Sequence, residues 1–108
     1  MKMANMAPVY ACMYQELAEQ ARSAGWALAI HGSMARDFDL VYVAWVRDPV
    51  EPRIVVEKAC SWFSIELVSE PVTTYHGRQI FTVKLSYGEA FLDMSFMPTS
   101  EWTPGCLK

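Results

Sequence analysis

The sequence predicts an α+β fold: a small mixed or antiparallel sheet with two main helices on one side, in a single domain that spans residues 1–108. Two segments carry apolar residues at helical spacing, and they flank a pair of short apolar runs. The last third of the chain favours two or three further strands, because apolar and polar residues alternate there. With 108 residues, 53% of them hydrophobic, the chain can bury one core.

The first half of the chain is predicted to form a helix and two strands. Apolar residues recur at helical spacing over residues 10–24, and Gly25 follows as a stop signal. Residues 26–30 form a continuous apolar run that is too short for a helix between Gly25 and Gly32, so we expect a strand buried on both faces. Residues 38–46 are rich in Val, Tyr and Trp, which predicts a central strand.

A second helix is expected to begin at Pro49. Asp48 precedes this proline as an N-cap acid, and proline is favoured in the first helical position. The helix is predicted to run to Trp62 or Phe63. Its apolar residues cover a broad arc, so we expect much of its girth to be buried.

The last third of the chain is predicted to be β structure. Residues 65–68 favour either a short strand or a frayed helix end. Residues 78–87 alternate between apolar and polar, and a hairpin turn at residues 88–89 is expected to lead into a strand over 90–97. Residues 99–108 are expected to form a flexible tail.

Composition excludes several classes of function. Twelve acidic and nine basic residues give a formal charge of -3, which argues against strong nucleic-acid binding. No apolar run reaches the ~18 residues of a membrane span, and no secretory signal is evident, so we expect a cytoplasmic protein. Three widely spaced cysteines predict neither a disulfide framework nor a zinc site. The large apolar fraction predicts self-association, with a dimer as the expected form.

Three aspartates stand out as candidate metal ligands. Asp37 and Asp39 are two residues apart at the start of a predicted strand, so their side chains share a face. Asp93 lies inside an apolar strand, where aspartate is disfavoured. If the strands that carry them are neighbours, the three carboxylates could surround Mg²⁺ or Mn²⁺.

These residues resemble the signature of the nucleotidyltransferase superfamily, whose fold is typified by DNA polymerase beta. The matching parts, in order, are Ile30-Gly32-Ser33, Asp37-Phe38-Asp39-Leu40 and Leu92-Asp93-Met94. The resemblance implies a minimal nucleotidyltransferase-like fold in which Gly32 and Ser33 hold the phosphates of a nucleoside triphosphate. It further implies that Asp37 and Asp39 bind the metal, and that Asp93 completes the site and helps activate the attacking hydroxyl.

A closer resemblance is to short proteins encoded by tailed phages, which brings no established activity and implies the host cell cytoplasm. It rests on His31-Gly32-Ser33, Ala35-Arg36-Asp37, Trp45, His76-Gly77-Arg78 and Asp93-Met94-Ser95. Arg36 and Arg78 could clamp phosphates, although surface ion pairs are a commoner role for arginine. Only three residues separate Ser33 from Asp37, which leaves no room for the phosphate-holding helix usual in the nucleotidyltransferase superfamily.

Each candidate residue also has a purely structural interpretation. Asp37 and Asp39 could form a turn in which Asp39 pairs with Arg36. Asp93 could be a protective charge on an edge strand, or it could pair with Lys84 across a hairpin. His31 could be a hydrogen-bonded core histidine, since it continues an apolar run. The alternative function is therefore a noncatalytic phage accessory or protein-interaction protein with a degenerate nucleotidyltransferase fold.

Overall fold

The computed structural model describes residues 7–34, 37–85 and 90–99. Within these ranges the chain forms two helices and six strands, as the α+β prediction requires. The elements in chain order are α1 (Ala7–Ser23), β1 (Trp26–His31), β2 (Asp37–Ala44), α2 (Pro52–Phe63), β3 (Glu66–Leu67), β4 (Val72–Thr73), β5 (Gln79–Lys84) and β6 (Phe91–Phe96).

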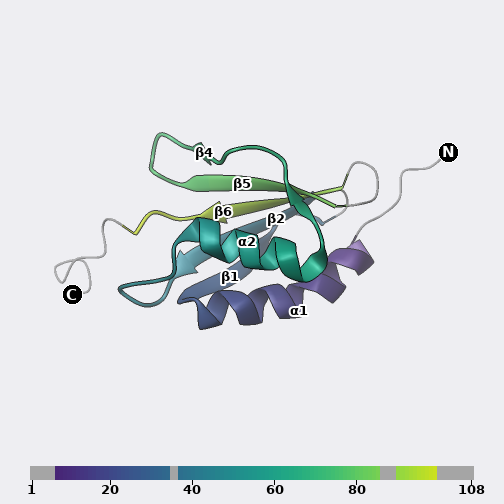
Figure 1. Cartoon of the computed structure of the whole chain (residues 1–108), viewed down its shortest axis with the longest axis horizontal. Helices are drawn as coiled ribbons and strands as arrows, with labels where there is room; N and C mark the ends of the chain where they lie inside the picture. The colour runs from purple at the N-terminus through teal and green to yellow at the C-terminus, as the bar shows by residue number, and fades with distance from the viewer. Residues whose placement is uncertain (1–6, 35–36, 86–89, 100–108) are drawn as a thin grey trace.

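The six strands form one mixed sheet in the order β1-β2-β6-β5-β3, with β4 pairing to β5 beyond the end of β3. Neighbouring strands are antiparallel except for β2 and β6, which run parallel in the middle of the sheet. Both helices pack on the same face of this sheet (Figure 1). The opposite face carries no helix among the described residues, and we call it the open face.

Alternation along the strands places the core on the helix-covered face. Alternate residues of β2, β5 and β6 are 0–4% exposed on this face: Phe38, Leu40, Tyr42, Ala44, Phe81, Val83, Leu92, Met94 and Phe96. From α1, Tyr10 stacks on Phe38 with ring centroids 4.7 Å apart, and from α2, Val55, Val56 and Ala59 complete the same cluster. Because burial of apolar surface is the main favourable term in folding, this layer holds the domain together.

The first strand differs from the prediction. β1 covers the expected residues, but it lies at the edge of the sheet, and the side chains of Ala27, Ala29 and Ile30 are exposed. The expectation that the strand is buried on both faces is therefore wrong. The physical reason is that an apolar run predicts that some of its side chains are buried, but it does not predict whether the strand lies at the centre or at the edge of a sheet.

The second helix begins three residues later than predicted. Pro52 rather than Pro49 lies in its first turn, and Glu51 is the N-cap residue, with no side-chain capping bond. The expectation that much of the surface of this helix is buried is also wrong, because Ile54 and Trp62 of α2 are 55% and 62% exposed.

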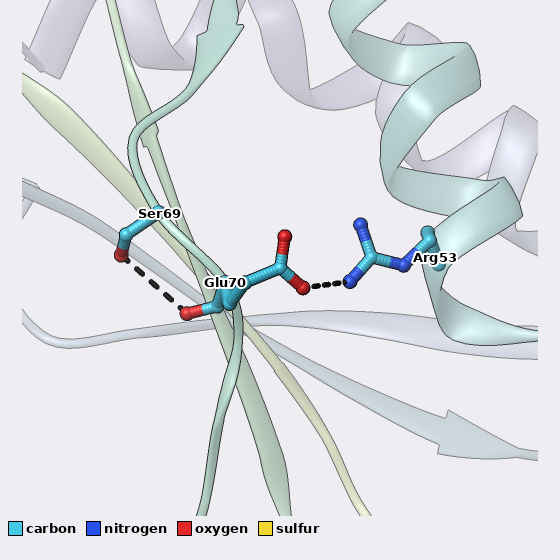
Figure 2. Close-up of polar contacts among 3 residues, drawn as sticks. All are labelled: Arg53, Ser69 and Glu70. Atoms are coloured by element: carbon cyan, nitrogen blue, oxygen red, sulfur yellow. Dashed lines mark hydrogen bonds and ion pairs between the residues drawn. The ribbon is translucent and has the colours of Figure 1, made fainter.

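A surface ion pair fastens the first turn of α2 to the loop that follows β3. Arg53 Nη2 contacts Glu70 Oε1 at 2.5 Å, and Figure 2 shows the two side chains meeting end to end. Glu70 also offers its backbone oxygen to the Ser69 hydroxyl at 3.4 Å. This contact positions the loop without contributing to the core.

The last third follows the predicted alternation, although several details fall outside the described residues. The segment 65–68 contains the short strand β3 and no helix end. The expected hairpin turn at residues 88–89 lies outside the described ranges, and so does the expected tail beyond residue 99. The described residues contain no helix that is long and apolar enough to cross a membrane.

Candidate functional site

A row of polar side chains crosses four strands on the open face. The strand register pairs His31 of β1 with Asp39 of β2, Asp39 with Asp93 of β6, and Asp93 with Thr82 of β5. Residues paired in register share a face, and the neighbours of these residues along β2, β5 and β6 are buried beneath the helices. We call these four residues the carboxylate row.

Asp39 and Asp93 form the centre of the carboxylate row. They lie side by side on the two parallel central strands, and Thr82 Oγ1 donates a hydrogen bond of 3.2 Å to Asp93 Oδ1. Partial burial raises the pKa of Asp93 above its ordinary value, and the hydrogen bond from Thr82 opposes this rise. A hydrogen bond with the Asp39 carboxyl group and the charge of Asp39 raise the pKa of Asp93 further. Two adjacent carboxyl groups of this kind compete for one proton, and a cation can replace that proton.

The turn after β1 brings Gly32 against Asp39. Gly32 has a φ of +87°, and a Cβ atom built on it would lie 3.1 Å from Asp39 Oδ2. Glycine is therefore favoured here for two reasons: its backbone conformation and the close carboxylate. Ser33 follows as an exposed residue, and Met34 also has a positive φ, of 65°.

The carboxylate row borders an open pocket of about 450 Å³ on the same face. His31, Asp39 and Asp93 lie at one end of it, and Arg78, which immediately precedes β5, belongs to the lining as well. Val41, Ile80 and Ser95 occupy the next register row and form the floor. The pocket therefore combines an acidic end, a cationic side chain and a largely apolar floor.

The structure does not bring all the predicted site residues together. Asp37 shares the open face but pairs with Phe91, two residues and therefore about 7 Å along the strand from Asp39. Within the described ranges, no three His, Cys, Asp or Glu side chains are grouped closely enough to hold a metal ion. Arg36 lies outside the described residues.

The three aspartates nevertheless act on a common neighbour. Tyr10 of α1 lies under this end of the sheet, and burial is the main cause that raises the pKa of its phenol. The charge of Asp37 is the next cause, and the charges of Asp39 and Asp93 add smaller effects. A backbone hydrogen bond with Phe91 works in the opposite direction. The negative charges of the aspartates thus also affect Tyr10, which belongs to the core on the helix-covered face.

Four of the structural interpretations are wrong. Asp37 and Asp39 lie within strand β2 and form no turn. Asp93 is on a central strand, so it is no edge charge, and Lys84 lies opposite Phe91 instead of Asp93. His31 is exposed, so it is no core histidine. His76 and Gly77 lie in a turn, in which Gly77 N donates to Thr74 O at 2.9 Å.

Sequence reasoning overlooked Thr82 as the hydrogen-bond partner of Asp93. The signal was available, because a threonine lies on the polar side of the alternating strand, but its use requires the correct hairpin register. Compared with known proteins, the chain matches no family model, no curated protein and no solved structure.

Proposed function

We propose that this protein is a minimal, metal-dependent nucleotidyltransferase-like domain that binds a nucleoside triphosphate on its open face. The observation that carries the proposal is the contact between Asp39 and Asp93 on adjacent parallel strands. A pair of carboxylates that is partly exposed on a sheet face, beside a glycine turn, has no role in the packing of the core. It is suited to a cation that is itself shared with a phosphate.

The donor set fits Mg²⁺ or Mn²⁺ better than a metal that needs a closed protein cage. Magnesium is commonly held by one or two carboxylates, with substrate phosphates and water as the remaining ligands. Asp39 and Asp93 would hold the ion, which would neutralise phosphate charge and assist attack on the α-phosphate. Asp37 lies farther along the same strand, so its negative charge would attract the ion from a distance, and its carboxylate would not be a direct ligand.

The other proposed roles follow from position. The turn at Gly32 and Ser33 opens directly beside Asp39, so its backbone can approach a phosphate without steric hindrance from a side chain at Gly32. Arg78 lies in the same pocket and supplies positive charge for phosphate oxygens. Asp93, whose pKa is raised, is the candidate to accept a proton from an attacking hydroxyl.

One observation favours a second candidate, a noncatalytic interaction protein that keeps the fold alone. Asp93 already has two partners, the hydroxyl of Thr82 and the carboxyl group of Asp39. In this interpretation these two neighbours satisfy Asp93, and no metal is needed.

Thermal melting with Mn²⁺ and a non-hydrolysable nucleoside triphosphate separates the two functions. A ligand that binds only the folded state stabilises it by about 2.7 kcal/mol at a concentration one hundred times its Kd. We expect the melting temperature of the parent protein to rise with Mn²⁺, and to rise further with the nucleotide. Asp39→Asn and Asp93→Asn should each abolish the response.

Asp48→Asn is the matched control, since it removes an exposed aspartate outside the carboxylate row. It should respond to Mn²⁺ as the parent does. Equal shifts in the parent and in Asp39→Asn would overturn the metal-dependent function and leave the interaction protein.

A further inference from the structure

The free edge of β1 has a defined set of backbone groups. Trp45 N donates to Gly25 O at 3.0 Å, which fixes the phase of the β1–β2 ladder, so odd-numbered residues of β1 bond to β2. The N–H and C=O groups of Trp26, Leu28 and Ile30 therefore point away from β2, outward from the edge of the sheet. The Tyr14 hydroxyl confirms this phase, because it donates to Leu28 O at 2.7 Å from the edge side.

Apart from the Tyr14 hydroxyl on the Leu28 carbonyl, this edge lacks the sequence features that usually prevent strands from pairing. Natural edge strands carry lysine, proline or a bulge, whereas residues 26–30 are Trp-Ala-Leu-Ala-Ile, without charge or proline. β1 pairs with β2 in unbroken register over all six of its residues, so it has no bulge. An uncharged edge of this length is a template for another strand.

The sequence of the edge is close to a palindrome about Leu28. Large and small side chains alternate symmetrically, with Ala27 and Ala29 on either side of the centre and Trp26 and Ile30 at the ends. If a second copy pairs antiparallel about Leu28, Trp26 lies opposite Ile30 of the partner subunit. Each alanine then lies opposite an alanine. The outward backbone groups of Trp26, Leu28 and Ile30 become the hydrogen-bonded pairs of the new ladder.

A groove beside β1 lies next to the residues of this pairing. The edge groove, of about 420 Å³, runs between α1 and the first half of β1, and its lining is mostly apolar: Tyr14, Ala18, Arg22, Trp26, Ala27, Leu28 and Trp45. Ile30, at the other end of the strand, is 39% exposed. The two-fold axis carries Ile30 of the partner subunit to the Trp26 end of the edge groove. In the dimer, the edge groove of each subunit then faces Ile30 of the other subunit.

From this self-complementarity we infer that the protein forms a two-fold dimer through β1, which joins two sheets into one continuous sheet. Such an axis is perpendicular to the sheet, so both open faces, with their carboxylate rows, lie on the same side of the assembly. The inference does not depend on the proposed function, because the pairing uses residues 26–30, and His31, the only residue of the carboxylate row on β1, lies outside them.

Tyr14 sets the balance between monomer and dimer. In the monomer its hydroxyl satisfies the Leu28 carbonyl, which in the dimer accepts from the Leu28 N–H of the partner subunit. The hydroxyl therefore competes with the partner for one acceptor. Tyr14→Phe removes the competitor but keeps the ring, and it should tighten the dimer.

Sedimentation equilibrium tests the interface. We expect the parent protein to sediment as a dimer, Ile30→Lys to weaken association by about tenfold or more, and Tyr14→Phe to strengthen it. Val72→Lys is the control, since Val72 is 64% exposed on β4 at the opposite side of the sheet, and this variant should remain dimeric. A monomeric parent, or an Ile30→Lys variant that associates as tightly as the parent, would overturn the inference.

Disulfide trapping tests the position of the axis. In a variant with Cys12, Cys60 and Cys106 changed to serine, Leu28→Cys places two thiols directly opposite each other, with Cα atoms about 5.5 Å apart. Ala29→Cys, one residue along, places its thiols on the other face, with Cα atoms about 8 Å apart, beyond the reach of a disulfide. Mild oxidation should cross-link only Leu28→Cys. Equal cross-linking of both variants, or of neither, would rule out a two-fold axis at Leu28.

Discussion

The two faces of the sheet are built from the same strands and have opposite characters. On the helix-covered face, the side chains of Phe38, Leu40, Leu92 and Met94 are 0% exposed. On the open face, the residues between them include Asp39 and Asp93, and both are partly exposed. Because strand side chains alternate, one face carries the packing while the other is free to carry polar chemistry. The comparison predicts that substitutions on the two faces differ in what they change: those on the helix-covered face lower stability most, whereas those on the open face change the response to ligands.

The largest expected effect is on the helix-covered face at Phe96. Its ring lies 4.1 Å from Tyr42, 5.0 Å from Trp26 and 5.7 Å from Phe81, measured between centroids. Phe96→Ala should cost about 3–5 kcal/mol of unfolding free energy, since it removes a buried ring and leaves a cavity. Urea unfolding followed by circular dichroism measures this loss. Val43→Ala on the open face, where Val43 is 47% exposed, should cost less than about 1 kcal/mol. Similar costs at both positions would contradict the division between faces.

The second effect distinguishes the faces at alkaline pH. Tyr42 is buried on the helix-covered face, and burial raises the pKa of its phenol far above the ordinary value, with a smaller contribution from Cys60. Above pH ~10 the unfolded chain loses this proton while the folded protein keeps it, so stability falls by up to about 1.4 kcal/mol per pH unit. Tyr42→Phe should remove this contribution to the fall. Unfolding curves between pH 9 and 11 provide the measurement, and an unchanged pH slope in the variant would contradict the prediction.

The third effect concerns the open face above pH ~4. The raised pKa of Asp93 means that the folded protein binds a proton that the unfolded chain has already released. Stability should therefore fall as the pH rises from about 4 through the pKa of Asp93, by less than about 1 kcal/mol because the group is partly exposed. Asp93→Asn should reduce this fall. Mn²⁺ should stabilise the parent only where the proton is lost. Urea unfolding of the parent and of Asp93→Asn at pH 4 and pH 7, with and without Mn²⁺, tests both expectations, and a parent whose stability does not fall relative to that of the variant over this range would refute them.

The smallest effect lies outside both faces, at the ion pair of Arg53 and Glu70. Glu70 is 83% exposed, and surface pairs of this kind contribute about 0–1 kcal/mol. Glu70→Gln should lower stability by less than about 0.5 kcal/mol, and the difference should shrink as salt is added. Urea unfolding in low and high salt measures it, and a loss above about 1 kcal/mol would show that the loop after β3 is coupled to the core.

The division between the faces was largely predictable from the sequence, because period-two alternation is a local property. The alternating strand β5 and the shared face of Asp37 and Asp39 follow from it, whereas the central strand β2 was predictable from its richness in Val, Tyr and Trp. The start of α2 was not predictable in the same way. Pro49 and Pro52 both satisfy the rule for a first helical position, and the first was chosen because an aspartate precedes it.

Contacts between distant strands were predictable only conditionally. A turn at residues 88–89 would pair Asp93 with Lys84, whereas the observed register pairs it with Thr82. An error of two residues keeps the face correct but exchanges a salt-bridge partner for a hydroxyl donor. The sequence also could not establish that β1 would be an edge strand, because this depends on which strands pair with β2. The side chain of Asp93 was identified correctly as unusual, but its neighbours were a matter of topology.

The parallel pairing of β2 with β6 has a consequence for the order in which the protein assembles. Asp37 pairs with Phe91, 54 positions further along the chain, and β6 lies between β2 and β5. The ribosome releases the chain from its N-terminal end, so β6 emerges after every other described strand. During synthesis, β2 therefore lacks its neighbour β6 until the end. Until then, Phe38, Leu40 and Tyr42 lack the residues of β6 that lie beside them in the core of the native state. Contacts of such long sequence separation slow folding and leave apolar surface open to proteases and to aggregation. A nascent chain that is interrupted before Phe91 therefore has no means to close its sheet.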